Sequence, residues 1–232
     1  MKVLFNADDY GLTKGVTDGI ITAHTKGVIS STTLMMNGLA VDYAIDQARK
    51  HPELKVGIHL VLTWGKSLRS GLKQITDTQG TFRYKNTYRE MEVPDLLEVE
   101  AEWRAQLEAF QNTGLSLHHI DSHHHVHGWE PLRELVLTLA KEYEVPVRYA
   151  PSLKQHSSYL LTDMLWLEFY EDGITSNLFD QLKNENATSI EVMTHPAFVD
   201  DALRHESSYT LKREEELEVL CSLQVPEWVE LL

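Results

Sequence analysis

The chain has 232 residues, of which 42% are hydrophobic and 24% are charged, and these values are ordinary for a folded globular protein with one α/β domain. Its 35 acidic residues outweigh 21 basic ones, and the formal net charge of −14 argues against nucleic acid or an anionic membrane surface as a partner. A single cysteine excludes an internal disulfide, no apolar run reaches the ~20 residues of a membrane-spanning helix, and the first residues lack a secretory pattern, so we expect a cytoplasmic protein.

Residues 1–63 alternate short apolar runs with amphipathic stretches. The opening run is typical of a buried strand, and it stops at the adjacent carboxylates of Asp8 and Asp9. Gly27 follows a stretch with helical spacing, at the place where a C-terminal cap is expected. We therefore expect strands at 2–6, 28–37 and 56–63, and helices at 15–26 and 41–48. In the third of these strands, His59 points away from the apolar face.

The same alternation resumes after a long connection. Residues 65–94 show no sustained period, and we expect them to form a loop that covers the functional site. Beyond this loop the apolar spacing predicts helices at 96–110, 131–139, 158–170, 177–184 and 211–221. It also predicts strands at 118–127, 145–149 and 189–194.

Alternating strands and helices predict a parallel sheet with helices packed outside it. In such folds the chemistry gathers at the C-terminal ends of the strands. The polar groups at such ends, on five predicted strands, are Asp8, Asp9, His59, the histidines of 118–127, Arg148 and His195. Because strand ends converge on one axis in a barrel, this distribution favours a barrel over an open sheet. We predict a single-domain (β/α) barrel that spans residues 1–232.

The segment 118–127 packs six histidines and one aspartate into ten residues. A core could not satisfy so many polar groups without a charge or a metal, and a terminal purification tag would not lie between two predicted helices. In an extended strand with period-2 alternation, one face carries the metal-binding and proton-transfer groups His119, Asp121, His123, His125 and His127. The same alternation turns His118 and His124 to the other face.

Aspartate and histidine side chains from separate strands are the ligands of an open mononuclear metal site, in which three protein groups leave a position for water. Of the adjacent Asp8 and Asp9, one can bind the metal while the other takes a proton from the water. Zn²⁺ suits such ligands, and carboxylate and water also suit Mg²⁺ or Mn²⁺.

Four motifs resemble, in the same order, those of the YdjC-like carbohydrate deacetylase family. They are NADDYG at 6–11, GIHL at 57–60, HIDSHHHVH at 119–127 and EVMTHPAF at 191–198, and the likeness runs from residue 3 to about residue 220. The resemblance implies a distorted, TIM-like barrel of seven strands and removal of N-acetyl groups from small sugars. It also implies a divalent metal cofactor, with Mg²⁺ preferred, and a homodimer.

Position by position, the resemblance assigns Asp9, His59 and His123 to the metal and makes Asp8 the catalytic base. His195 matches a late histidine placed to act as the catalytic acid, and the ordinary histidine pKa of ~6.5 would allow its protonation near neutral pH. The residues expected to bind substrate or to support the metal ligands are Asp121, His125, His127 and Arg148.

These observations predict a metal-dependent hydrolase that removes the N-acetyl group from acetylated mono- or oligosaccharides, such as N-acetylglucosamine oligomers, in carbohydrate catabolism. The aromatic side chains of Trp64, Trp129 and Tyr149 near strand ends either stack on sugar rings or belong to the core. Two alternatives stay open. A phosphoester hydrolase with the same metal requires several basic residues near the site. A catalytically silent sugar-binding protein requires the metal ligands alone, without Asp8 and His195.

Overall fold

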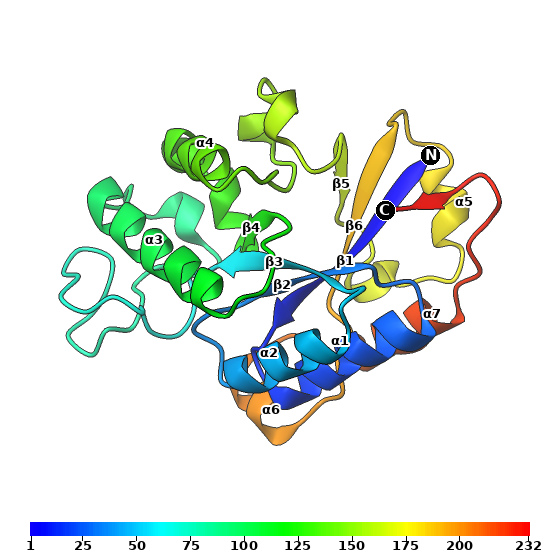
Figure 1. The fold of residues 1–232 in the computed structure, drawn as a ribbon, viewed down its shortest axis with the longest axis horizontal. Helices are drawn as coiled ribbons and strands as arrows, with labels where there is room; N and C mark the ends of the chain where they lie inside the picture. Colours follow the sequence, from blue (N-terminus) through cyan, green and yellow to red (C-terminus); the bar gives the residue numbers. More distant parts are fainter.

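The computed structural model describes residues 1–232 and is built around one parallel sheet (Figure 1). Its strands are β1 Lys2–Tyr10, β2 Ser31–Leu34, β3 Lys55–Leu60, β4 Ile120–Ser122, β5 Met164–Trp166, β6 Ser189–Thr194 and β7 Glu230–Leu231. The spatial order is β4-β3-β2-β1-β6-β5, and β7 pairs with the beginning of β1. The first three strands and β6 confirm the strands expected from the sequence near these positions.

Helices flank the strands, as the alternating pattern predicts. They are α1 Lys14–Lys26, α2 Val41–Lys50, α3 Leu96–Asn112, α4 Arg133–Glu142, α5 Leu178–Leu182, α6 Asp201–Glu206 and α7 Leu211–Ser222. In Figure 1, α1, α2 and α7 lie on one side of the strands, and α3 and α4 lie on the other. None of the helices combines the length and the apolar composition needed to cross a lipid bilayer.

The sheet curls into a distorted half-barrel, which confirms the predicted fold class. Regular pairing stops at β4 and β5 on its two edges. Between these edges, Val147 forms single parallel bridges to Ile120 and to Leu160. The strand expected at 145–149 is therefore reduced to a bridging residue, and the barrel is irregular along this side.

The prediction of a helix at 158–170 is wrong. This segment contains a short 3-10 turn at Ser157–Tyr159 and then β5, which pairs with β6. Its apolar residues recur at intervals that fit a helix, but the edge of β6 offers unpaired backbone groups that a neighbouring strand satisfies. Tertiary pairing thus outweighs the local pattern.

The strands of the half-barrel have two different faces. The outward face, represented by Phe5, Ile58 and Val192, packs into the hydrophobic core with the helices. The inward face carries buried polar side chains, and hydrogen bonds link Asn6 to both Asp8 and Thr33. The fold therefore places a polar network inside the half-barrel and its apolar core outside.

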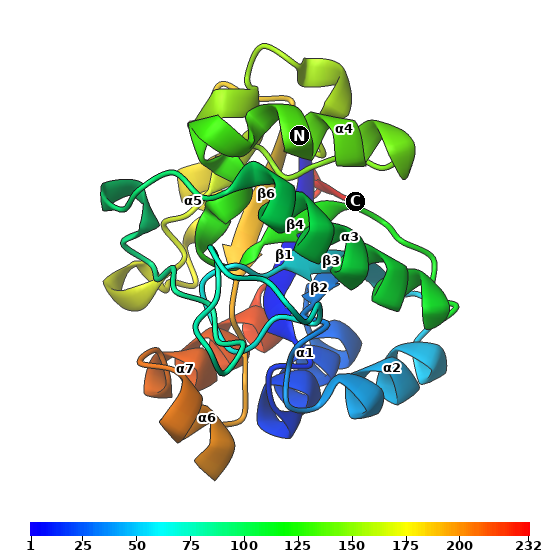
Figure 2. The ribbon, with the colours of Figure 1, turned by 90° about the vertical axis from the view of Figure 1, so that its left-hand side faces the viewer.

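The connection at 61–95 confirms the expected long loop, with a single 3-10 turn at Tyr88–Glu90. It runs in front of the strands in the view of Figure 2. Two carboxylates of α3 hold it down: Glu102 accepts hydrogen bonds from the backbone N–H groups of Leu68 and Arg69, and Glu98 accepts others nearby. The part of the loop between Leu68 and Gln74 is thus fixed to α3.

Candidate metal and catalytic site

A cavity of about 510 Å³ opens at the C-terminal ends of the strands. This volume lies within the usual range for small-molecule sites. Its lining includes the residues of the predicted centre, namely Asp8, Asp9, His59, His123 and His195. The sequence thus identified side chains that the fold brings into one cavity from four separate segments.

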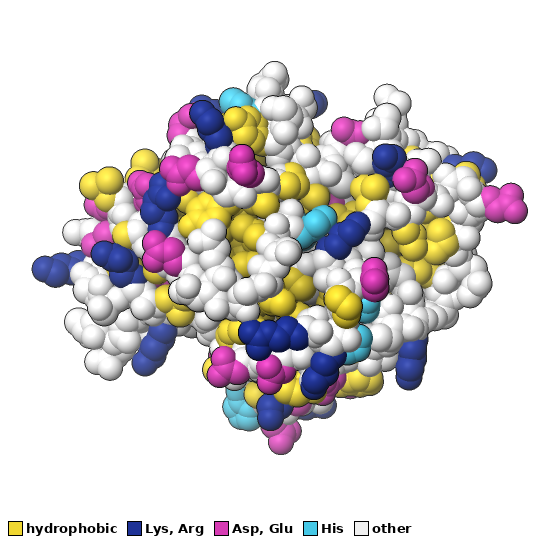
Figure 3. Space-filling model, viewed as in Figure 1, with side chains coloured by type: hydrophobic (Ala, Val, Ile, Leu, Met, Phe, Trp, Pro, Cys, Tyr) yellow, Lys and Arg dark blue, Asp and Glu magenta, His cyan; other side chains and the backbone are white.

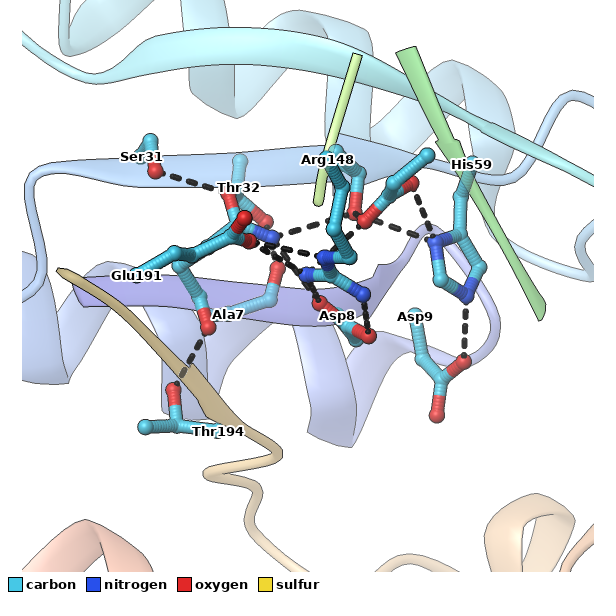
Figure 4. Close-up of polar contacts among 12 residues, drawn as sticks. Ala7, Asp8, Asp9, Ser31, Thr32, His59, Arg148, Glu191 and Thr194 are labelled. Carbon is cyan, nitrogen blue, oxygen red and sulfur yellow. Dashed lines mark hydrogen bonds and ion pairs between the residues drawn. The ribbon is translucent and has the colours of Figure 1, made fainter. Parts of the chain in front are cut away.

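A backbone irregularity at the end of β1 separates the two adjacent carboxylates. The pairing of β1 with β2 shifts register between Ala7 and Tyr10, and Asp9 adopts a left-handed backbone with φ of 68°. Such a conformation is uncommon for a residue other than glycine and clusters at functional sites. As a result, Asp8 points into the half-barrel toward Arg148, whereas Asp9 faces His59 (Figure 4).

Asp9, His59 and His123 form a compact group of ligand atoms. Asp9 Oδ1 lies 3.4 Å from His59 Nε2 and 2.9 Å from His123 Nδ1. All three ligand atoms lie within 4.8 Å of one another, a spread compatible with one ion bonded at about 2.0–2.2 Å to each. The resemblance had assigned these three residues to the metal, and the donor set fits that assignment.

Asp121 orients His59 for such a role. Its Oδ1 lies 2.7 Å from His59 Nδ1, and its Oδ2 accepts a hydrogen bond from Thr33. A carboxylate on one ring nitrogen fixes the tautomer that leaves the other nitrogen free for a metal. Burial acts to lower the pKa of His59, but Asp121 and Asp9 outweigh it and raise that pKa to about 10.

The charge balance of the buried groups also fits a divalent cation. Four buried carboxylates surround two buried guanidinium groups, and these residues are Asp8, Asp9, Asp121, Glu191, Arg148 and Arg213. Burial raises the pKa of the Glu191 carboxyl to about 7. A divalent cation bound at His59 Nε2 would take the place of the proton that the raised pKa otherwise keeps there, and it would compensate the excess of carboxylates, because buried charges require partners.

Arg148 holds Asp8 from inside the half-barrel. Its Nη1 donates to Asp8 Oδ2 at 2.7 Å and its Nη2 to Asp8 Oδ1 at 2.5 Å, while the same guanidinium contacts Glu191 (Figure 4). Burial would raise the pKa of Asp8, but the Arg148 charge outweighs it and holds that pKa well below its usual range. Asp8 is therefore ionised and fixed. Arg148 does not line the cavity, and its predicted role in binding or support stays a prediction.

His195 lines the cavity next to two tyrosines. Its ring makes edge contacts with Tyr170 and Tyr209, with centroids 5.7 Å apart in both cases. Burial, reinforced by the nearby Arg213 charge, lowers the pKa of His195 to about 4. The imidazole is therefore neutral at neutral pH in this structure, in contrast to the ordinary pKa expected from the sequence.

The histidine-rich segment departs from the expected strand. The assigned strand β4 covers only Ile120–Ser122, and 123–128 forms a 3-10 turn in which His124 and His125 have left-handed backbones. Period-2 alternation therefore ends at Ser122. The prediction that His124 turns away from the site is wrong, because His124 lines the cavity and its Nδ1 lies 2.9 Å from the Thr63 hydroxyl.

The other histidines of this segment divide between the cavity and the interior. His125 lines the cavity, and its Nδ1 is buried without a hydrogen-bond partner. His127 turns inward instead, where its Nδ1 lies 2.7 Å from the Ser122 hydroxyl. His119 is fully buried beside His118, with the two Nδ1 atoms 2.9 Å apart. The predicted parts of His125 and His127 in substrate binding or ligand support stay predictions.

Of the three aromatic residues proposed to stack on sugars, only Trp64 lines the cavity. Trp129 is buried against Tyr84 and Tyr88 in the core, and Tyr149 does not contribute to the wall. Several other lining residues are absent from the sequence-based prediction, among them Lys85, Asn86, Tyr170, Ser207, Ser208, Tyr209 and Arg213. Two of them, Lys85 and Asn86, come from the long loop that was expected to cover the site.

Arg213 is the most direct addition to the predicted centre. Its Nη2 donates to Asp9 Oδ2 at 2.7 Å, while Asp9 Oδ1 faces the two histidines. Arg213 is buried and comes from α7. Its position continues the helical stripe of Leu217 and Leu220, and this spacing was the one sequence signal that could have identified it.

Comparisons with known proteins agree with this geometry. A family model described as YdjC-like protein matches residues 2–231. A carbohydrate deacetylase from Oceanobacillus iheyensis is 58% identical to this chain, over 99% of this chain and 100% of its own length. A carbohydrate deacetylase from Brevibacillus brevis is 41% identical, over 99% of this chain and 94% of its own length. A crystal structure from Enterococcus faecalis V583, provisionally described as a cellobiose-phosphate cleavage protein, is 34% identical with a TM-score of 0.87, covering 95% of this chain and 90% of its own.

Proposed function

The chain belongs to the YdjC-like family, and we propose that it is a metal-dependent carbohydrate deacetylase that removes N-acetyl groups from small acetylated saccharides such as N-acetylglucosamine oligomers. The observation that carries the proposal is the grouping of Asp9, His59 and His123 in a cavity that also exposes Asp8 and His195. Relatives between 37% and 58% identical over nearly the whole chain are named carbohydrate deacetylases. Hydrolysis of an acetamide needs a Lewis acid, a base and an acid, and this cavity offers residues for each.

Asp9, His59 and His123 would hold the divalent ion. Mg²⁺ is the first choice from the family resemblance, and Zn²⁺ or Mn²⁺ also suits the donor set. When bound, such an ion supplies Lewis acidity that polarises the acetyl carbonyl and lowers the pKa of water. Arg213 and Asp121 would keep Asp9 and His59 in the orientation that binding requires.

Asp8 would take the proton from the attacking water. The ion pair with Arg148 keeps Asp8 ionised at neutral pH, and its two bonds to that guanidinium fix its direction. The same ion pair makes Asp8 a weak base, and a metal that lowers the pKa of the water would offset this. His195 would give a proton to the leaving nitrogen, because an amine anion is too poor a leaving group to depart unprotonated. Negative charge that develops on the substrate favours the protonated form of His195, which offsets the lowered pKa of the free site.

The cavity walls suit a neutral sugar. Trp64 and Tyr170 offer flat aromatic faces, and Asn86, Ser207 and Ser208 offer groups that hydrogen-bond to hydroxyls. Figure 3 shows basic side chains interspersed with acidic ones on the viewed face, without a continuous basic patch. This surface provides no general attraction for polyanionic substrates.

A phosphoester hydrolase is less well supported. It requires free cationic groups in the cavity, and Lys85 and Arg213 are the only lysine and arginine residues that line it. Arg213 is already paired with Asp9. A silent binding protein would not need Asp8 and His195, both of which face the cavity.

A cytoplasmic homodimer completes the proposal. The lone Cys221 is in keeping with a reducing compartment, and the dimer rests on the family resemblance. Exposed apolar residues such as Val93, just before α3, and Leu97, in its first turn, offer a surface that a second copy could cover. Size-exclusion chromatography with light scattering would measure the oligomeric state.

The test is a panel of N-acetylated and O-acetylated sugars of one to four units, assayed for amine and acetate release with and without a chelator. We expect release from N-acetylated sugars that stops when the metal is removed and returns when it is restored. Release that continues unchanged in chelator, or phosphate release from sugar phosphates without deacetylation, would contradict the proposal.

A further inference from the structure

Helix α7 brings a buried carboxyl group against the backbone of His195. Glu216 is fully buried, and its Oε2 accepts a hydrogen bond from the His195 backbone N–H. Its Oε1 accepts a hydrogen bond of 2.5 Å from the Tyr209 hydroxyl. Both partners line the cavity, so the carboxyl connects two parts of its wall.

The same carboxyl faces the buried edge of the His195 ring. His195 Nδ1 is buried without a hydrogen-bond partner and lies 3.9 Å from Glu216 Oε1. Because Nδ1 points into the protein while the residue lines the cavity, the edge that carries Nε2 is the one available to a substrate. A neutral imidazole can act as an acid only after it gains a second proton, and imidazolium needs an acceptor at each N–H.

We propose that Glu216 is a positioning residue for His195: it fixes the backbone, provides an oxygen partner for Nδ1–H, and so makes Nε2 the nitrogen that protonates the leaving amine. This inference rests on the proposed function. In the step itself, the C–N bond breaks as the Nε2 proton moves to nitrogen, and the imidazole returns to its neutral form. The proton lost to the amine is balanced by the one that Asp8 takes from the attacking water.

The surroundings of Glu216 argue against a purely structural role. A buried carboxyl is unfavourable without partners, and burial raises the pKa of Glu216 to about 8. The titratable and charged groups that act on this pKa are His195 after β6 and Tyr209 before α7, which contact the carboxyl, and the charges of Arg213 on α7 and Asp8 on β1. An apolar residue would extend the stripe of Leu217 and Leu220 without burying an ionisable group, whereas both hydrogen bonds of the carboxyl go to cavity-lining residues.

The test compares Glu216→Gln with His195→Ala, the double variant and a matched control, Glu218→Gln, which lies on the exposed side of the same helix. Glutamine can keep the bond from the His195 backbone, but it presents an amide group where Nδ1–H needs an acceptor. We expect Glu216→Gln to bind metal like the wild type and to lose ~10–100-fold in kcat on an N-acetylated sugar with little change in KM. The loss on an O-acetyl ester should be much smaller, and Glu218→Gln should match the wild type.

The double variant decides whether the two residues act together. If Glu216 works through His195, the double variant is no slower than His195→Ala alone. Losses that multiply, or a reduced metal affinity in Glu216→Gln measured by calorimetry, would overturn the inference. If Glu216→Gln does not fold, Glu216→Asp replaces it under the same criteria, because the shorter side chain draws the carboxyl away from His195.

A second measurement does not depend on activity. In the NMR spectrum of histidine-labelled protein, the His195 ring signals are identified by their absence from His195→Ala. We expect them to shift in Glu216→Gln and to stay in place in Glu218→Gln. If the wild type deacetylates no sugar, the proposed function fails, while unchanged ring signals in Glu216→Gln would refute the positioning of His195 by Glu216.

Discussion

The inward and outward faces of the same strands differ in how strongly their side chains depend on one another. On the outward face, Phe5, Ile58 and Val192 pack against helices, and each contact is replaceable by another apolar side chain of similar volume. On the inward face, Asp8 and His59 belong to one hydrogen-bonded network of charges, in which each group depends on a partner from another strand. The difference shows that the outward face determines stability locally, whereas the inward face is sensitive to the loss of any single member.

The largest effect is expected from His59→Ala. The change removes one of three ligand atoms and leaves Asp121 without its imidazole partner. Metal content should fall toward zero, and kcat/KM should fall by more than the ~10²–10⁴-fold that one acid–base group contributes. Elemental analysis of the purified variant measures the first quantity. Full metal occupancy in a folded variant would show that His59 is not a ligand.

The next largest effect is expected from His195→Ala. The variant should keep its metal and lose ~10²–10⁴-fold in kcat on an N-acetylated sugar, because protonation of the leaving nitrogen is lost. An O-acetyl ester has a better leaving group and should lose much less. Steady-state kinetics on matched amide and ester substrates measures the contrast. Equal losses on both substrates would mean that His195 positions the substrate or the metal and is not the acid.

A stability test of the inward face is Arg148→Met. The substitution keeps much of the side-chain volume but leaves Asp8, Asp121 and Glu191 buried without their shared cation. The free energy of unfolding should fall by about 3–5 kcal/mol, as expected when one partner of a buried ion pair is removed. Denaturant unfolding in metal-free buffer measures it. A loss below about 1 kcal/mol would mean that the carboxylates are compensated in another way.

A pH test addresses the carboxyl of Glu216. Its pKa is raised from an ordinary 4.5 to about 8 by burial, so the protonated form is favoured by folding. Its contribution to stability is complete below pH 4.5 and is lost as the pH rises to about 8. Relative to the wild type, Glu216→Gln should therefore gain stability over this interval, by at most about 1.4 kcal/mol per pH unit. Thermal unfolding of both proteins between pH 5 and 8 checks the trend, and a constant difference would contradict it.

The smallest effect is expected on the outward face. Ile58→Val removes one methylene next to His59 in sequence but on the opposite side of β3. The cost should be about 0.5–1.5 kcal/mol of unfolding free energy, with unchanged kcat and metal affinity. Denaturant unfolding and steady-state kinetics measure the two quantities. A large loss of activity would show that the two faces are coupled more strongly than their packing indicates.

Local patterns in the sequence were sufficient to predict the order of most elements and the main members of the site. Apolar runs and helical stripes identified β1, β3, β6 and helices such as α1 and α7, because each pattern reflects which side of an element is buried. Polar residues at strand ends identified Asp8, Asp9, His59, His123 and His195, because parallel strands bring their C-terminal ends to one edge. These inferences need only local patterns and one general rule of topology.

Features that depend on backbone turns or on partners distant in the sequence became visible only in the folded structure. The left-handed backbones of His124 and His125 end the alternation that the sequence predicted. Histidine adopts this conformation more often than most residues, but the preference is too weak to identify the turn from the sequence. The spacing of α7 indicates that Arg213 lies on its apolar stripe, but only the packing of the helix against the cavity shows that Arg213 contacts Asp9 and that Glu216 contacts His195. A buried charge is stabilised by a partner that can be far away in the sequence, so its place in a site is a property of the folded chain.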